Sequence, residues 1–127
     1  MRFLSMIRID ENSGVVPSEQ LMRDMGKLIA EMTREGTLIS TAGLRPTAEG
    51  VRVRLRGGKL STVNGPFPET KEVIGGFAIV DVPSREEALE WAAKIAVACR
   101  CAQEVREILP DPPGLEQEVA SGRSAST

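Results

Sequence analysis

Hydrophobic positions along the chain repeat with two different periods, and each period predicts a different kind of element. A stripe at helical spacing predicts a helix from an N-cap at Ser18 to a stop before Gly36. A second helix is predicted after the capping box that Ser84 and Glu87 form. Strands are predicted where β-branched and alternating apolar residues gather, at residues 2–9, 37–42, 51–56, 60–63, 77–82 (entered through 73–76) and 101–109.

The order of these elements predicts the fold class. Strand, helix, strand, hairpin, strand, helix and strand follow one another, as in an α+β protein with a ferredoxin-like split βαβ arrangement. Both helices then cover one face of an antiparallel sheet, and the β-hairpin is an insertion. The first hairpin strand alternates, so its apolar residues are expected to face inward and its arginines outward (Val51, Val53 and Leu55; Arg52, Arg54 and Arg56). The arginine row is either a solvated face or an anion-binding face.

Two of the predicted strands, 2–9 and 77–82, carry apolar residues on both faces. Helices cover only one face of such a sheet, and a bare apolar sheet face on a small protein is an association site. We therefore expect a two-fold homodimer whose sheets pack face to face. One domain is expected over residues 1–109, followed by a Pro-rich and then disordered tail over residues 110–127.

The composition narrows the chemistry. The 127 residues include no histidine, so a Ser-His-Asp triad, a Cys-His pair and an imidazole metal ligand are excluded. A formal net charge of -2 and an aromatic content of 3% argue against a nucleic-acid-binding protein. The apolar N-terminal stretch is too short for a secretion signal, and no apolar run has the length of a membrane helix. A cytoplasmic protein without membrane attachment is expected.

The two cysteines of the chain, Cys99 and Cys101, are separated by one residue. Residues at this spacing rarely close a disulfide, and metal binding would need further ligands that histidine cannot supply. Both are interpreted as buried structural thiols. We expect no metal and no cofactor.

The segment Asn64-Gly65-Pro66-Phe67-Pro68-Glu69-Thr70-Lys71-Glu72 resembles the signature of the DGPF branch of the YCII-related family. Other motifs of the family occur in the expected order over about residues 1–109: the opening strand MRFLSMIRIDE, Gly43-Leu44-Arg45-Pro46, Gly75-Gly76-Phe77, Ser84-Arg85-Glu86-Glu87-Ala88, Trp91-Ala92 and Glu104-Val105-Arg106. The resemblance implies a dimeric α+β barrel whose function is mostly unassigned.

Compared with the family that it resembles, this chain lacks two residues that could take part in catalysis. One related class performs hydrolytic dehalogenation with a His-Asp pair, which cannot operate in a chain without histidine. Asn64 stands where the family usually has aspartate, and an amide neither takes up nor releases a proton near neutral pH. Some relatives are encoded beside or fused to extracytoplasmic-function sigma factors, which implies a regulatory or accessory setting.

A cleft at the dimer interface is expected to bind a small molecule. There Asn64 would form hydrogen bonds, while Arg45 and Lys71 would meet an anionic or carbonyl group. Glu104 and Arg106 share a strand face, and they are expected either to contact the ligand or to form a buried ion pair at the dimer interface. The expected ligand-binding residues are Arg45, Asn64, Gly65, Pro66, Phe67, Lys71, Glu104 and Arg106.

Three functions, and a purely structural role of the signature loop, remain open. The loop could instead pack Phe67 into the core or the dimer seam. The first function is a dimeric protein that binds a small molecule without chemistry of its own. The second is a hydrolase- or lyase-like enzyme with Glu69 or Glu72 as proton carrier and Lys71 or Arg45 as electrophile. The third is an accessory module that contacts a regulatory protein partner.

Overall fold

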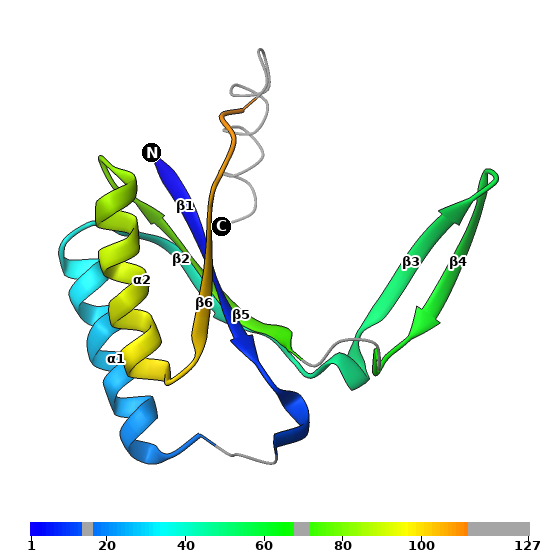
Figure 1. Cartoon of the computed structure of the whole chain (residues 1–127), viewed down its shortest axis with the longest axis horizontal. Coiled ribbons are helices and arrows are strands. Elements are labelled where there is room, and N and C mark those ends of the chain that lie inside the picture. Colours follow the sequence, from blue (N-terminus) through cyan, green and yellow to red (C-terminus); the bar gives the residue numbers. More distant parts are fainter. Residues whose placement is uncertain (14–16, 68–71, 112–127) are drawn as a thin grey trace.

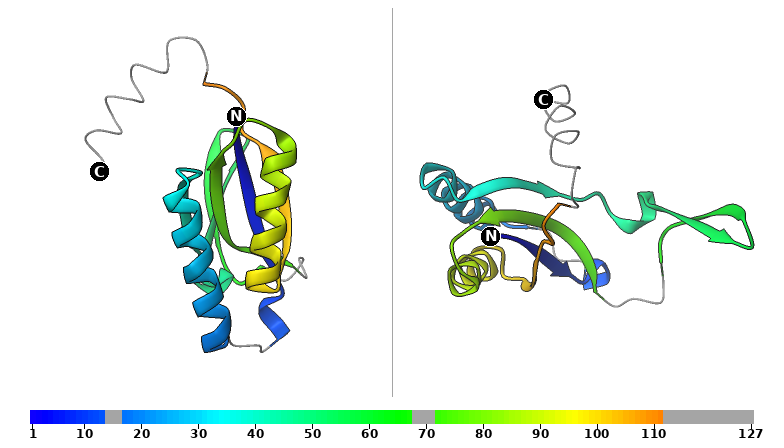
Figure 2. Two further views of the ribbon diagram at one scale, coloured as in Figure 1. Left: turned by 90° about the vertical axis from the view of Figure 1, so that its left-hand side faces the viewer. Right: turned by 90° about the horizontal axis from the view of Figure 1, so that it is seen from above.

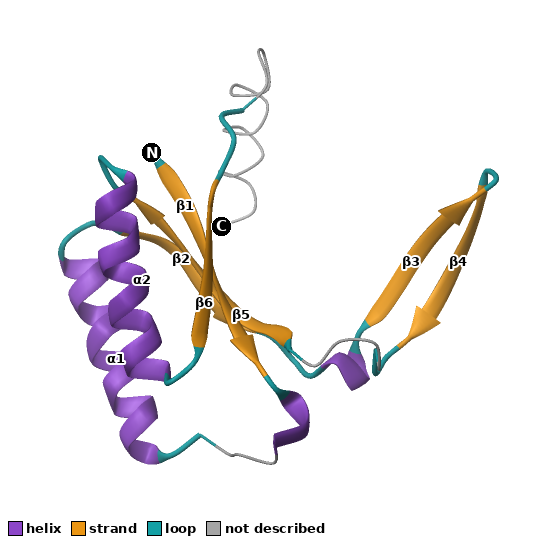
Figure 3. Ribbon diagram, viewed as in Figure 1, coloured by secondary structure: helices purple, strands orange, loops and turns teal. Residues whose placement is uncertain are grey.

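The computed structural model describes residues 1–13, 17–67 and 72–111, and these contain every element that the hydrophobic pattern predicts (Figure 1, Figure 3). The elements are β1 (Arg2–Ile9), η1 (Glu11–Ser13), α1 (Glu19–Arg34), β2 (Leu38–Gly43), η2 (Thr47–Glu49), β3 (Val51–Arg56), β4 (Lys59–Asn64), β5 (Val73–Asp81), α2 (Arg85–Cys99) and β6 (Ala102–Glu107). The last strand is shorter than predicted. Its start is displaced because Arg100 adopts a left-handed conformation (φ 56°) and the amide of Cys101 caps α2 through the carbonyl of Ala96.

Four strands form one antiparallel sheet in the order β2-β5-β1-β6. Strand β5 lies between β1 and β2, and β1 lies between β5 and β6, so each βαβ unit is split by a strand of the other. Figure 2 shows both helices against the same face of this sheet. The predicted α+β class, antiparallel sheet and inserted hairpin are confirmed.

The hydrophobic core lies between the two helices and the sheet. Its centre is formed by Phe3 from β1, Val80 from β5, Met32 from α1, and Trp91 and Ile95 from α2. The helices begin where predicted because serine side chains cap them. The hydroxyl of Ser18 accepts the amide of Leu21 at 3.1 Å, and the hydroxyl of Ser84 accepts the amide of Glu87 at 3.2 Å.

The opposite sheet face, which we call the open face, has a centre of four apolar side chains. The strand register aligns Leu4 with Ile79 and Met6 with Phe77, and the intervening residues of both strands point to the core instead. No helix among the described residues covers this face (Figure 2). The prediction of apolar residues on both faces of these strands is therefore confirmed, while the dimer stays a prediction.

The hairpin of β3 and β4 departs from the prediction. Val51, Val53 and Leu55 were expected to face inward, but 54%, 67% and 67% of their respective surfaces are exposed. The expectation is wrong because β3 and β4 pair only with each other and leave the four-stranded sheet, as Figure 1 shows. Alternation along a strand indicates that two faces differ, but it does not place a core against either of them.

The described helices include none with the length and apolarity needed to cross a membrane.

Candidate functional site

A cavity of about 650 Å³ lies where the end of β1, the start of α1 and the turn between α2 and β6 meet. Its walls combine apolar and charged side chains from segments that are far apart in the sequence. They are formed by Arg8, Ile9, Asp10, Glu11, Pro17, Ser18, Leu21, Glu72, Cys99, Arg100, Cys101 and Ala102. Because Arg8 pairs with Ala102 across β1 and β6, on the same strand faces as Met6, the cavity adjoins the open face.

Arg8 joins two of the acids that the sequence singled out. Its Nε lies 3.8 Å from Glu72 Oε2, and its Nη1 lies 3.5 Å from Glu104 Oε1. The side chain of Arg8 is 32% exposed, whereas those of Glu72 and Glu104 are about half exposed. Sequence reasoning missed Arg8. The signal was available, because a charged residue on the second face of a largely apolar strand needs oppositely charged neighbours.

Glu11, also missed in the sequence, connects the cavity to the base of the hairpin. Its carboxylate accepts the amide of Thr47 at 2.8 Å and the hydroxyl of the same residue at 2.5 Å. The neighbouring Asp10 accepts the amide of Asn12 at 2.9 Å. Both acids thus line the cavity while being held by neutral donors rather than by cations.

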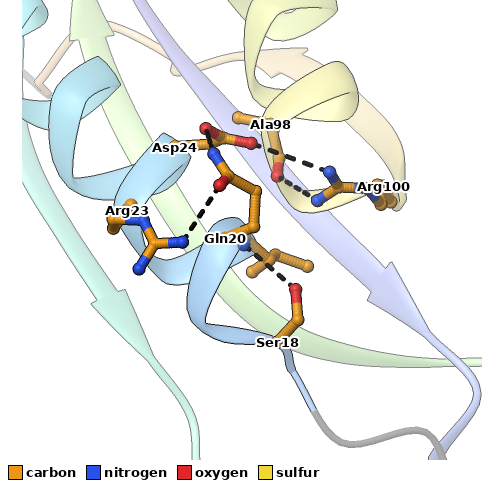
Figure 4. Close-up of polar contacts among 7 residues, drawn as sticks. Ser18, Gln20, Arg23, Asp24, Ala98 and Arg100 are labelled. Carbon is orange, nitrogen blue, oxygen red and sulfur yellow. Dashed lines mark hydrogen bonds and ion pairs between the residues drawn. The ribbon is translucent and has the colours of Figure 1, made fainter.

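Arg100 lines another part of the cavity and links α2 to α1 through an ion pair (Figure 4). Its guanidinium lies 3.7 Å from Asp24 of α1 and donates to the carbonyl of Ala98 at 3.4 Å. Gln20 donates to the same aspartate at 2.8 Å and accepts from Arg23 at 3.0 Å, which orients Asp24 toward α2. Both cavity arginines are therefore paired with acids, and the described lining, with two arginines and the three acids Asp10, Glu11 and Glu72, has an excess of negative charge.

The two cysteines form the apolar floor between α2 and β6. Both are free; Cys99 is buried and Cys101 is half-buried. Burial raises the pKa of the Cys99 thiol to about 11, and the neighbouring Cys101 contributes to this rise. Gln103 donates to Cys99 Sγ at 3.5 Å and accepts from Ser5 at 2.8 Å, so the thiol is part of a buried polar network. The described ranges contain no group of three or more cysteine and acidic side chains that could hold a metal ion.

We expect the two thiols to differ in reactivity. Because alkylation requires the thiolate, iodoacetamide at pH 8 should modify Cys101 at least about tenfold faster than the buried Cys99. Peptide mass spectrometry of samples quenched over time measures the two rates. In urea the two rates should converge, and equal rates in the native protein would contradict this account.

Residues 64–67, the described start of the signature, form the base of the hairpin instead of packing into the core. The amide of Gly65 donates to the carbonyl of Gly50 at 2.9 Å. The ring of Phe67 lies beside Gly50 and beneath the guanidinium of Arg52, whose central carbon is 4.0 Å from the ring centroid. Phe67 is only half-buried and lies outside the core cluster, so the alternative that it packs into the core is wrong, while its packing into a dimer seam stays a prediction.

Position 65 requires glycine because the backbone of Thr47 lies too close to leave room for a side chain. A Cβ there would lie 1.7 Å from the carbonyl oxygen of Thr47, and this oxygen belongs to the backbone and cannot turn away. We expect Gly65→Ala to destabilise the protein by about 1–3 kcal/mol and to loosen the hairpin base. Amide hydrogen exchange should accelerate in residues 47–52. Gly43→Ala is the matched control, since its Cβ would meet nothing within 4 Å; equal effects of the two changes would contradict the steric explanation.

The other expected ligand-binding residues are dispersed. Asn64 ends β4 opposite Val51 and is exposed, as is Pro66. Arg45 Nη2 lies 3.1 Å from Glu49 Oε2 on the surface, and Arg45 does not line the cavity.

Arg106 shares the open face with Glu104, as predicted, but Glu104 pairs with Arg8 rather than with Arg106. Glu69 and Lys71 lie outside the described residues. The structure thus brings Glu72 and Glu104 together and places Phe67 and Gly65 at a separate, neighbouring point.

Comparison with protein families matches residues 1–111 to the YCII-related domain. The chain belongs to the YCII-related family. This YCII-related chain is 35% identical over 80 residues to the uncharacterized protein R00369 of Rhizobium meliloti (strain 1021), a match that covers 63% of this chain and 64% of the relative. The matched part is therefore less than two thirds of that relative's length.

A solved structure with a similar arrangement is 5-chloro-2-hydroxyhydroquinone dehydrochlorinase (TftG) from Burkholderia phenoliruptrix AC1100, in complex with 2,5-dihydroxybenzoquinone. It aligns with a TM-score of 0.45 and 14% sequence identity, over 87% of this chain and 96% of the TftG chain.

Proposed function

We propose that this YCII-related protein is a homodimer that binds a small molecule with amino or hydroxyl donors in the cavity beside the open face. The observation that carries the proposal is the charge balance of the cavity. Arg8 and Arg100 are each paired with acids, whereas Asp10 and Glu11 accept from neutral groups. A ligand that supplies a positive charge or hydroxyl donors satisfies these carboxylates.

The apolar part of the cavity complements this charge. Ile9, Pro17 and Leu21 line one part of it, and Cys101 and Ala102 line another. A volume of about 650 Å³ lies in the range of sites that take small organic molecules, which are commonly apolar with a few polar contacts. We infer a ligand with an apolar ring or short chain and a donor group at one end.

The dimer is supported by the open face. A second copy would cover the partly buried Leu4, Phe77 and Ile79 beside the buried Met6, and it would bring a second cavity to the rim of the interface. A ligand position near the dimer interface is supported by Arg8, which lies on the open face and lines the cavity.

We assign the chain to the DGPF branch of the family. The support is the run from Asn64 to Phe67 followed by Thr70, Lys71 and Glu72, together with the steric requirement for Gly65. Binding is favoured over carboxylate catalysis, since Glu72 has a 54% exposed side chain and pairs with Arg8. A general acid or base works best in a dry pocket, and the Glu72 side chain is instead half exposed.

Two probes of similar size and opposite charge test the proposal. Tyramine carries an ammonium group and 4-hydroxyphenylacetate a carboxylate, and both have a phenol ring. Titration by ¹H–¹⁵N NMR should show tyramine binding more tightly, with shifts at residues 8–11 and 101–102. Glu11→Gln keeps an acceptor for Thr47 but removes the charge, and it should weaken tyramine binding about tenfold.

The matched control is Glu90→Gln, which removes an exposed acid of α2 that is not among the cavity-lining residues. It should leave tyramine binding unchanged. The proposal fails if 4-hydroxyphenylacetate binds more tightly, if neither probe shifts the cavity residues, or if both variants behave alike.

A further inference from the structure

The β3–β4 hairpin, which we call the arm (residues 51–64), has two chemically different faces. The register aligns Val53 with Thr62 and Leu55 with Leu60, so these side chains share one face with Val51. This face is apolar and open, because Leu55 is 67% exposed and Leu60 is 74% exposed. Exposed large apolar residues gathered on one ribbon face differ from the scattered ones that any surface carries.

The opposite face of the arm is basic. It carries Arg52, Arg54, Arg56 and Lys59, and the arm contains no acidic residue. The whole chain has a formal net charge of -2 and the arm contributes four positive charges, so the remaining residues carry a net charge of -6. The body of a second copy is therefore electrostatically complementary to the arm.

Several contacts hold the base of the arm, although its strands make no extensive contact with another described element. Glu11 holds Thr47 with two hydrogen bonds, and Gly65 bonds to Gly50 across the base. Phe67 packs beneath Arg52 at the same point. These contacts fix the direction in which the arm projects from the sheet, visible in Figure 1.

A two-stranded ribbon by itself is marginally stable in water, and its apolar face gains stability only when something covers it. We propose that the arm docks on a second copy of this chain, with its apolar face packed against the partner and its basic face near the partner's acids. This inference rests on the homodimer of the proposed function and assigns it a second contact, separate from the open face.

A nucleic acid is the other occupant that a basic ribbon would suit. It would neutralise the arginines but would leave Val53, Leu55 and Leu60 without an apolar partner. A protein surface of net negative charge satisfies both faces at once, and the second copy provides one.

The test compares the dimer dissociation constants of variants by sedimentation equilibrium. Leu55→Glu places a charge on the apolar face of the arm and should raise the dimer Kd at least about tenfold. Val97→Glu is the matched control, because Val97 on α2 is an equally open apolar residue (77% exposed), and its Kd should change less than about twofold. Benzoylphenylalanine at position 60 should give a light-dependent covalent dimer, whereas the same group at position 97 should not.

The outcomes separate this inference from the proposed function. A monomeric wild-type protein overturns both. A wild-type dimer whose Kd is unchanged by Leu55→Glu, and which forms no covalent product through position 60, overturns the arm contact and leaves the open-face dimer standing. Fluorescence anisotropy tests the nucleic-acid alternative. If duplex DNA binds through Arg54 and Arg56 and Leu55→Glu leaves the dimer Kd unchanged, nucleic acid is the occupant of the arm and the arm contact is overturned.

Discussion

Replacing Ile79 with glutamate is expected to convert the dimer into a folded monomer. Ile79 lies at the centre of the open face opposite Leu4, where face-to-face packing of two sheets would remove it from water. In a two-fold interface the substitution introduces two unpaired charges, and burial of an unpaired charge costs several kcal/mol. We expect the dimer Kd to rise at least about a hundredfold. Sedimentation velocity measures the assembly, and circular dichroism verifies that the monomer is folded.

A folded monomer is expected because the open face is separate from the core between helices and sheet. The neighbours of Ile79 in β5, Ala78 and Val80, point into that core and remain unchanged. Leu89→Glu on α2, where Leu89 is 43% exposed, is the matched control and should stay dimeric. If Ile79→Glu leaves the dimer intact, the sheets do not associate through the open face.

Truncating Met32 to alanine is expected to cost about 2–5 kcal/mol of unfolding free energy. Met32 is 1% exposed and lies on the buried side of α1 against the sheet. Its removal leaves a cavity between α1 and the sheet, and the Lys94–Glu31 ion pair holds α1 beside α2, so the site can collapse only in part. The total stability of a small domain is about 5–15 kcal/mol, so the loss is a large share of it. Urea unfolding measures the change.

Met22→Ala provides a control in the same helix and with the same side chain. Met22 is 66% exposed, and surface substitutions usually change stability by less than about 0.5 kcal/mol. Equal losses for Met22→Ala and Met32→Ala would show that α1 does not pack as described.

Local patterns were sufficient to predict the elements and their order. The stripe of α1 and the serine caps at Ser18 and Ser84 depend on neighbours three or four positions away, so the sequence displays them directly. Apolar residues on both faces of β1 and β5 likewise predicted that both faces of these strands are covered, and the structure places the two strands at the centre of the sheet.

The sequence was insufficient where the outcome depends on distant segments. Alternation in β3 is real, but no local signal shows that the hairpin leaves the sheet and exposes Val53 and Leu55. The cavity is assembled from four separate segments, and the charge balance that distinguishes Glu11 from Glu72 depends on which cation lies beside each acid. The sequence motifs predicted a ligand site at Asn64 and Arg45. In the structure Asn64 lies at the hairpin base and Arg45 lies on the surface, away from the cavity.

Native mass spectrometry of the wild-type protein, measured over a range of concentrations, tests the account most directly. The homodimer of the proposed function and the arm contact both depend on the association of two chains. We predict a species at twice the chain mass of 13.7 kDa, and its loss in the Ile79→Glu variant. A wild-type protein that stays at 13.7 kDa at every concentration would contradict the account, because the open face would then have no second copy to cover it.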